Sequence, residues 1–136
     1  MALRQLLTLC VQGRRDEALA LLDHHNQQAQ GQGQAQGGGL LEQPWEGMRF
    51  GVEDKGVYHG DRALHAASKG GSPELVLALL LRGADIHARS SGGWDALMCA
   101  SWYGQVAAAT VLLDRGADVL ARNDYQRTAL HFRISI

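Results

Sequence analysis

The sequence contains an internal repeat of 33 residues. When the chain is shifted by 33 positions, residues 57–89 lie over residues 90–122, and 14 of the 33 aligned pairs are identical. A third copy begins at Asn123. A fixed period of this length is typical of proteins built by stacking similar units, because one unit cannot bury its apolar face alone.

Each copy predicts two short helices that are separated by a turn. In the first copy, residues 63–70 carry small or apolar side chains at helical spacing, and Gly71 predicts the end of that helix. The run Ser72-Pro73-Glu74 then supplies a capping side chain, a proline for the first helical position and an acid for the first turn. We therefore expect a second helix to begin directly after the turn.

These residues resemble the ankyrin repeat. The family pattern contains Leu-His-x-Ala-Ala, a glycine between the two helices and Gly-Ala-Asp after the second helix, and this chain matches it from Val57 to about Phe132. Two kinds of departure occur: alanine replaces the family's proline at Ala63, Ala96 and Ala129, and Met98 replaces the histidine of the second copy. The resemblance implies an all-α, ankyrin-repeat solenoid of stacked helix-turn-helix units with hairpin-like loops.

The period divides the chain into five expected segments. They are a degenerate N-terminal capping helix pair (1–25), a Gln/Gly-rich flexible tract with an insertion loop (26–56), two ankyrin repeats (57–89 and 90–122) and a truncated repeat (123–136). Six apolar residues are expected to anchor the insertion to the stack: Leu40, Leu41, Trp45, Met48, Phe50 and Val52. The insertion is interpreted as a surface elaboration, with a binding loop as the alternative.

The third copy departs from the pattern near its end. Arg133 and Ile134 stand where the first two copies have small residues, and the second helix of the unit is missing. We therefore expect the last stacked face to be only partly covered. A truncated gene product, a splice form or an engineered end would explain this pattern, and fraying of the terminus is the milder alternative.

Composition excludes several function classes. Lys plus Arg is 13 and Asp plus Glu is 14, so a net charge of −1 gives no reason to expect nucleic acid as the partner. The longest apolar run, 75–81, is far shorter than the roughly 20 residues that span a bilayer, so no membrane insertion is expected. Two cysteines cannot form a disulfide framework, so a reducing compartment is the expected location of the protein. A cytoplasmic location is expected, with the nucleus as the alternative and a mitochondrial location disfavoured.

Motifs that would indicate catalysis are missing from the sequence. It contains no nucleophile elbow, phosphate-binding loop, zinc-protease helix or Cys-x-x-Cys pair. Cys99 is interpreted as a small buried hydrophobic residue rather than a nucleophile. The six histidines lack metal-ligand spacing, and the resemblance assigns His65 and His131 to hydrogen bonding within the turn. We therefore expect no enzyme activity, no cofactor and no metal.

Aromatic residues are concentrated at positions that line the concave groove of an ankyrin stack, where the resemblance implies that partners bind. The candidate partner-binding residues are Tyr58, His59, Lys69, Arg89, Trp94, Trp102, Tyr103, Arg122 and Tyr125. Trp94, Trp102 and Tyr103 are the expected anchors, because large aromatic side chains dominate protein interfaces. Arg89 and Arg122 would suit an acidic or carbonyl-rich ligand. Alternatively, Trp102 and Tyr103 pack against neighbouring loops or under the insertion.

Leu77 and Leu81 form a second apolar feature, because the family usually has charged residues there. A helix that is apolar all round is normally covered on both sides. The insertion is the expected cover, and self-association through these leucines or through the uncapped C-terminal face is the alternative.

The sequence thus predicts a non-catalytic module that binds a partner protein through the concave groove. The alternative is a regulatory or targeting fragment of a larger multidomain protein, for example an enzyme, whose other domains are missing from this chain.

Overall fold

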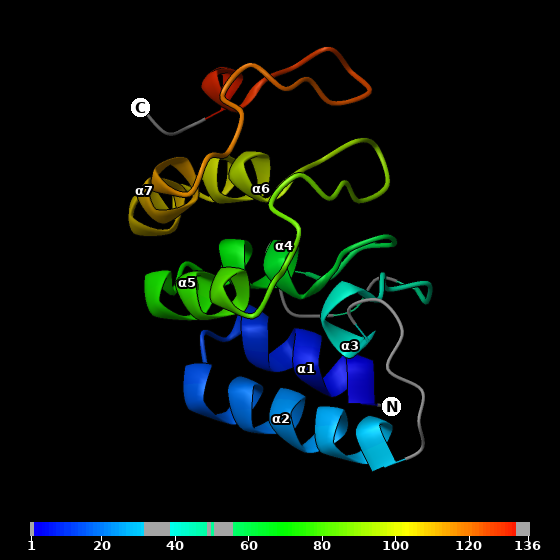
Figure 1. The fold of residues 1–136 in the computed structure, drawn as a ribbon. Coiled ribbons are helices and arrows are strands. Elements are labelled where there is room, and N and C mark those ends of the chain that lie inside the picture. The colour runs from blue at the N-terminus through cyan, green and yellow to red at the C-terminus, as the bar shows by residue number, and fades with distance from the viewer. Residues whose placement is uncertain (1, 32–38, 49, 51–55, 133–136) are drawn as a thin grey trace.

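The computed structural model describes residues 2–31, 39–48, 50 and 56–132. They form a stack of helix pairs whose first and last described elements lie toward opposite ends (Figure 1). The elements are α1 (Ala2–Val11), α2 (Arg15–Gly31), α3 (Gly39–Glu42), α4 (Ala63–Gly70), α5 (Pro73–Leu81), α6 (Ala96–Trp102), α7 (Val106–Asp114) and the 3-10 turn η1 (Ala129–His131). The described part of the chain is all-α, as expected.

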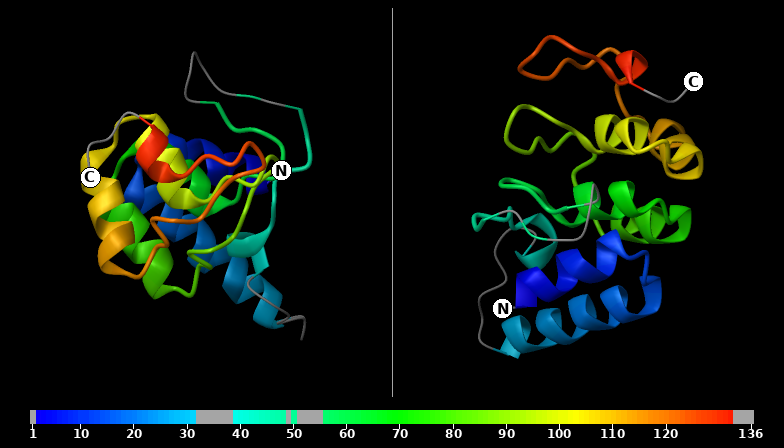
Figure 2. Two further views of the ribbon diagram at one scale, coloured as in Figure 1. Left: turned by 90° about the horizontal axis from the view of Figure 1, so that it is seen from above. Right: turned by 180° about the vertical axis from the view of Figure 1, so that it is seen from behind.

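Two rows of helices make up the stack. Helices α1, α4 and α6 and the turn η1 pack in succession to form one row, and α2, α5 and α7 form the other. The loops before α4, α6 and η1 project to the same side and lie one above another (Figure 2). The core lies between the two rows, where leucines such as Leu6, Leu75, Leu79 and Leu112 are fully buried.

The turn between α4 and α5 follows the sequence signals. Gly71 has a φ of 82°, a left-handed conformation that glycine adopts without a steric penalty. The Ser72 hydroxyl accepts a hydrogen bond from the Leu75 amide at 3.3 Å, and Pro73 is the first residue of α5. The predicted end of one helix and start of the next are confirmed here.

The N-terminal helix pair packs onto the first full repeat, with α1 against α4 and α2 against α5. Helix α2 continues to Gly31, so the expectation of a flexible tract is wrong for residues 26–31. Glutamine and alanine have high helix propensity, and the helix extends through them. Residues 32–38 lie outside the described part of the chain.

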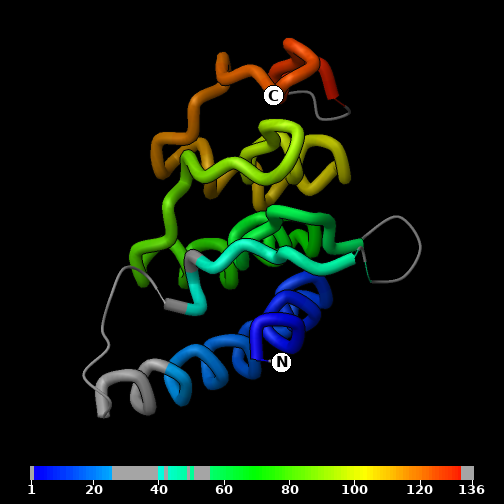
Figure 3. The backbone as a smooth tube through the Cα atoms, turned by 90° about the vertical axis from the view of Figure 1, so that its right-hand side faces the viewer, coloured from blue at the N-terminus to red at the C-terminus, as the bar shows by residue number. Residues whose placement is uncertain are grey.

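The insertion is anchored by its apolar residues and by backbone pairing. Leu40 and Leu41 are buried in the core. The Trp45 amide donates to the Asp61 carbonyl at 2.8 Å, and Phe50 forms an antiparallel bridge with Val57. Figure 3 shows this segment running beside the loop that precedes α4.

Two expectations about apolar cover are wrong. Met48 is 89% exposed, so it does not anchor the insertion, and Val52 lies outside the described residues. Leu81 is 67% exposed because α3 packs against α2 and α4 rather than over the outer side of α5. Leu77 is half-buried. Self-association through these leucines stays a prediction.

The C-terminal end of the stack exposes a residue of core type. Leu130 is 51% exposed, whereas its equivalents one and two periods earlier, Leu97 and Leu64, are buried. The partly covered end face was expected, while Arg133 and Ile134 lie outside the described residues. Among the described helices, none has the length and apolar character needed to cross a membrane.

Candidate functional site

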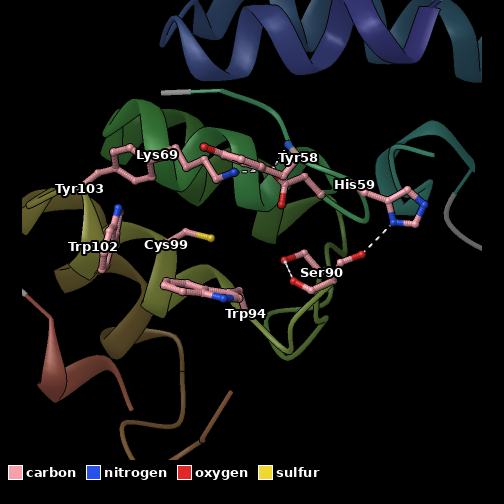
Figure 4. A pocket seen from close by; sticks show the side chains of 10 residues that line it. Tyr58, His59, Lys69, Ser90, Trp94, Cys99, Trp102 and Tyr103 are labelled. Carbon is pink, nitrogen blue, oxygen red and sulfur yellow. Dashed lines mark hydrogen bonds and ion pairs between the residues drawn. The ribbon is translucent and has the colours of Figure 1, made fainter. Parts of the chain in front are cut away.

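A hollow of about 410 Å³, here called the first hollow, lies between the first two full repeats (Figure 4). Its lining residues are Tyr58, His59, Asp61, Lys69, Ser90, Ser91, Trp94, Cys99, Trp102 and Tyr103. Six of the nine candidate partner-binding residues are among them: Tyr58, His59, Lys69, Trp94, Trp102 and Tyr103. Helix α4 with its preceding loop supplies one side of the hollow, and α6 with its preceding loop supplies the other.

A buried ion pair holds one side of the first hollow. The Lys69 ammonium pairs with the Asp61 carboxylate and donates to the Gly56 carbonyl at 3.1 Å. It also lies 4.7 Å from the centroid of the Tyr58 ring, and Asp61 accepts from the Tyr58 amide at 3.0 Å. Lys69 is only 4% exposed, which corrects its prediction as an exposed partner contact. Its charge positions Tyr58 instead.

Aromatic side chains form the opposite wall. The Trp94 and Trp102 rings meet edge to face with centroids 5.8 Å apart. Phe132 stacks on Trp94 at 4.9 Å and meets Trp102 at 5.5 Å. Trp102 is nevertheless 46% exposed. The Trp102 ring thus packs against the Trp94 and Phe132 rings and still presents apolar surface to the hollow.

Sequence reasoning missed the contribution of Phe132. This residue stands one period after Cys99 and two periods after Ala66, so a large ring occupies a position that is small in the other copies. This difference in side-chain size between the copies is the sequence signal that could have identified Phe132. Its ring is accommodated because it lies on the Trp94 face, outside the tightly packed rows of helices.

A second hollow of about 580 Å³ lies on the other side of the tryptophans. It is lined by Trp94, Trp102, Asn123, Tyr125, Arg127, His131 and Phe132. The structure therefore places Tyr125 in this second hollow rather than in the first. The pair of tryptophans is a common wall between the two.

The two candidate arginines outside the first hollow differ in their contacts. Arg89 donates to the Gly93 carbonyl at 3.1 Å and to the Arg122 carbonyl at 2.6 Å. It therefore fastens successive loops together, and because its side chain is exposed, its role as a partner contact stays a prediction. The Arg122 side chain is exposed and lines neither hollow.

His65 connects α4 to the loop that carries Trp94. Its Nδ1 accepts from the Arg62 amide at 3.0 Å, so the neutral ring holds its proton on Nε2. Nε2 then donates toward the carbonyls of Ala88 and Trp94 at 3.1 and 3.0 Å. The expected hydrogen bond within the turn is present, and a second contact crosses to the next repeat.

Burial of the His65 ring lowers its pKa from 6.5, because desolvation disfavours the charged form. Asp61 opposes this shift and Lys69 adds to it. The unfolded chain then binds the proton more readily than the folded chain, so stability falls as the pH drops through 6.5.

We expect the free energy of unfolding from urea titrations to decrease as the pH is lowered from 7.5 to 5.5. His65→Gln should flatten this dependence, and an unchanged slope would contradict it.

The Cys99 thiol, which lines the first hollow, is unreactive. Burial raises the pKa of Cys99 to about 12, and it does the same for Cys10. A thiol with this pKa is almost entirely protonated at neutral pH and is a poor nucleophile. Among the described residues, no cluster of three or more His, Cys, Asp or Glu side chains is arranged to hold a metal ion.

Comparisons with known proteins agree with the stacked helix pairs. A family model described as ankyrin repeats in three copies matches residues 40–123, more than half of the chain. Protein phosphatase 1 regulatory subunit 27 of Homo sapiens is 43% identical over 65 residues, which cover 48% of this chain and 42% of that protein. The Mus musculus protein of the same name gives the same values. The chain therefore matches about two fifths of the length of these relatives.

Proposed function

The chain belongs to the ankyrin repeat family, and from that premise we propose that it is a non-catalytic module that binds a partner protein through its two hollows. The observation that carries this proposal is the wall formed by Trp94 and Trp102 between them. A partly exposed tryptophan beside a concave surface is the typical energetic centre of a protein interface.

The mechanism is docking onto a preorganised surface. The rings of Trp94, Trp102 and Phe132 hold one another at centroid distances of 4.9–5.8 Å. The loops below them are also joined, since the His59 ring lies 2.8 Å from the Ser91 hydroxyl. Little side-chain entropy is therefore lost when a partner binds. An apolar side chain of the partner fills the first hollow against Trp102.

Replacing Trp102 with alanine tests this proposal. Random peptides displayed on phage are selected on the full chain, and the affinity of a selected peptide is measured by fluorescence anisotropy. We expect Trp102→Ala to weaken binding at least tenfold, because truncation of such an anchor typically costs about 2 kcal/mol or more. Leu81→Ala, an exposed apolar change on α5, is the matched control and should leave affinity unchanged. If folded Trp102→Ala and wild type bind the selected peptide with equal affinity, the proposal that partners bind in the groove is refuted.

A regulatory role on protein phosphatase 1 is the second candidate function. The 65 matched residues are similar to proteins of Homo sapiens and Mus musculus that are named as regulatory subunits of protein phosphatase 1, and this similarity supports the candidate. It also agrees with the alternative that the chain is the regulatory or targeting part of a larger protein. Binding of purified protein phosphatase 1 to the immobilised chain tests this candidate. Saturable binding that Trp102→Ala abolishes would support it, and no binding at micromolar concentration would reject it.

A further inference from the structure

The second hollow contains hydrogen-bond donors that the described part of the chain leaves unused. Asn123 is 3% exposed, and its Oδ1 accepts from the amides of Tyr125 and Arg127 at 2.9 and 3.1 Å. These two bonds fix the orientation of the side-chain amide. Its Nδ2 is buried and has no hydrogen-bond partner among the described residues. A buried donor without a hydrogen-bond partner is costly, and it calls for a specific explanation such as a bound group.

Two further donors line the same hollow. The exposed Arg127 guanidinium makes no hydrogen bond or ion pair with the described residues. The Nδ1 atom of His131 accepts from the Thr128 amide at 2.9 Å, which leaves the proton of the neutral ring on Nε2. The equivalent Nε2 of His65 donates to two carbonyls, whereas that of His131 bonds to no described residue.

The charges of the two hollows differ. In the first hollow, Asp61 neutralises Lys69. In the second, no acidic side chain is among the described lining residues, while Arg127 supplies a positive charge. Donors without acceptors, together with an unbalanced guanidinium, suit a group that only accepts hydrogen bonds and is negatively charged.

From these observations we propose that the second hollow is a specificity subsite for a carboxylate, the Asp or Glu side chain of a partner peptide. This inference rests on the proposed function, because the same peptide would place an apolar side chain in the first hollow. Asn123 and Arg127 donate to the carboxylate, and His131 Nε2 is the third donor. The shared wall of Trp94 and Trp102 separates the two subsites.

The test uses the phage-displayed peptides selected on the full chain. We expect enrichment of an apolar residue together with a nearby Asp or Glu. In a synthetic selected peptide, changing the acidic residue to its amide should weaken binding to wild type about tenfold. Arg127→Ala should weaken binding of the acidic peptide by a similar factor and remove the preference over the amide. Arg115→Ala is the matched control, since this exposed arginine lies at the end of α7 and lines neither hollow.

Asn123→Asp is the sharper variant. It keeps an oxygen for the amides of Tyr125 and Arg127, so the turn is retained, while the donor becomes a second acceptor with a negative charge. We expect at least a tenfold loss of affinity for the acidic peptide and an unchanged circular dichroism spectrum. Binding of the amide peptide should be affected much less.

The outcomes separate this inference from the proposed function. Selection of apolar residues without an acidic preference would overturn the subsite while leaving the groove intact. Failure to select any peptide whose binding depends on Trp102 would overturn both. If a phosphoserine peptide binds more than tenfold tighter than its glutamate counterpart, the second hollow is a subsite for a phosphate and the proposed carboxylate subsite is overturned.

Discussion

Replacing Lys69 with methionine is expected to lower the free energy of unfolding by about 3–5 kcal/mol. Methionine fills similar space but leaves the Asp61 carboxylate, which is 1% exposed, without its partner charge. The hydrogen bond from the ammonium to the Gly56 carbonyl is lost as well. Urea titration followed by far-UV circular dichroism measures the change.

A matched ion pair at the surface provides the control. Arg82 pairs with Asp23 between α5 and α2, where both side chains are at least one third exposed. Arg82→Met should therefore cost no more than about 1 kcal/mol. The double variant Asp61→Asn with Lys69→Met should be more stable than Lys69→Met alone, because no uncompensated charge stays buried. If the free energy of unfolding of Lys69→Met lies within about 1 kcal/mol of the wild-type value, the burial of this pair is contradicted.

Gly60→Ala should be the second severe change. Gly60 has a φ of 87°, and a Cβ atom there would lie 2.5 Å from the backbone nitrogen of Ser91 in the next loop. The left-handed conformation costs about 1–2 kcal/mol for alanine. Displacement of the neighbouring backbone adds about 1–3 kcal/mol. We therefore expect the free energy of unfolding in the same urea titration to fall by about 2–5 kcal/mol.

Gly83→Ala separates the two contributions to this loss. Gly83 also has a positive φ, 97°, but nothing lies within 4 Å of the added Cβ. This control should show only the conformational cost of about 1–2 kcal/mol. Equal losses for the two variants would mean that the loops before α4 and α6 do not approach as closely as described.

The period of 33 residues was sufficient to predict most of the fold. Local signals, such as the capping Ser72 and the glycine at 71, act within a few residues and can be read from the sequence directly. Six candidate residues meet in the first hollow because the stacking register places equivalent positions above one another. The period and the local signals thus predicted the helices, whereas the line of the groove was predicted from the resemblance to ankyrin repeats.

The remaining features depend on contacts between units, which periodicity does not report. Lys69 is buried because Asp61 and the Gly56 carbonyl come together in three dimensions. Arg89 is engaged by carbonyls of the same and the next loop, and Leu81 is exposed because α3 packs against α2 and α4. The second hollow depends on Phe132, whose size breaks the repeat pattern. Such particular contacts distinguish one copy from the next.

The indole N–H resonances of the three tryptophans test the central claim most directly. Trp94 and Trp102 form the wall of the groove, while the Trp45 indole donates to the Met48 carbonyl at 2.9 Å within the insertion. The chain is titrated with a phage-selected peptide, and the three signals are followed by NMR. We expect the Trp94 and Trp102 signals to shift with the bound fraction while the Trp45 signal stays in place. A shift of Trp45 alone would contradict the groove and place the partner on the insertion.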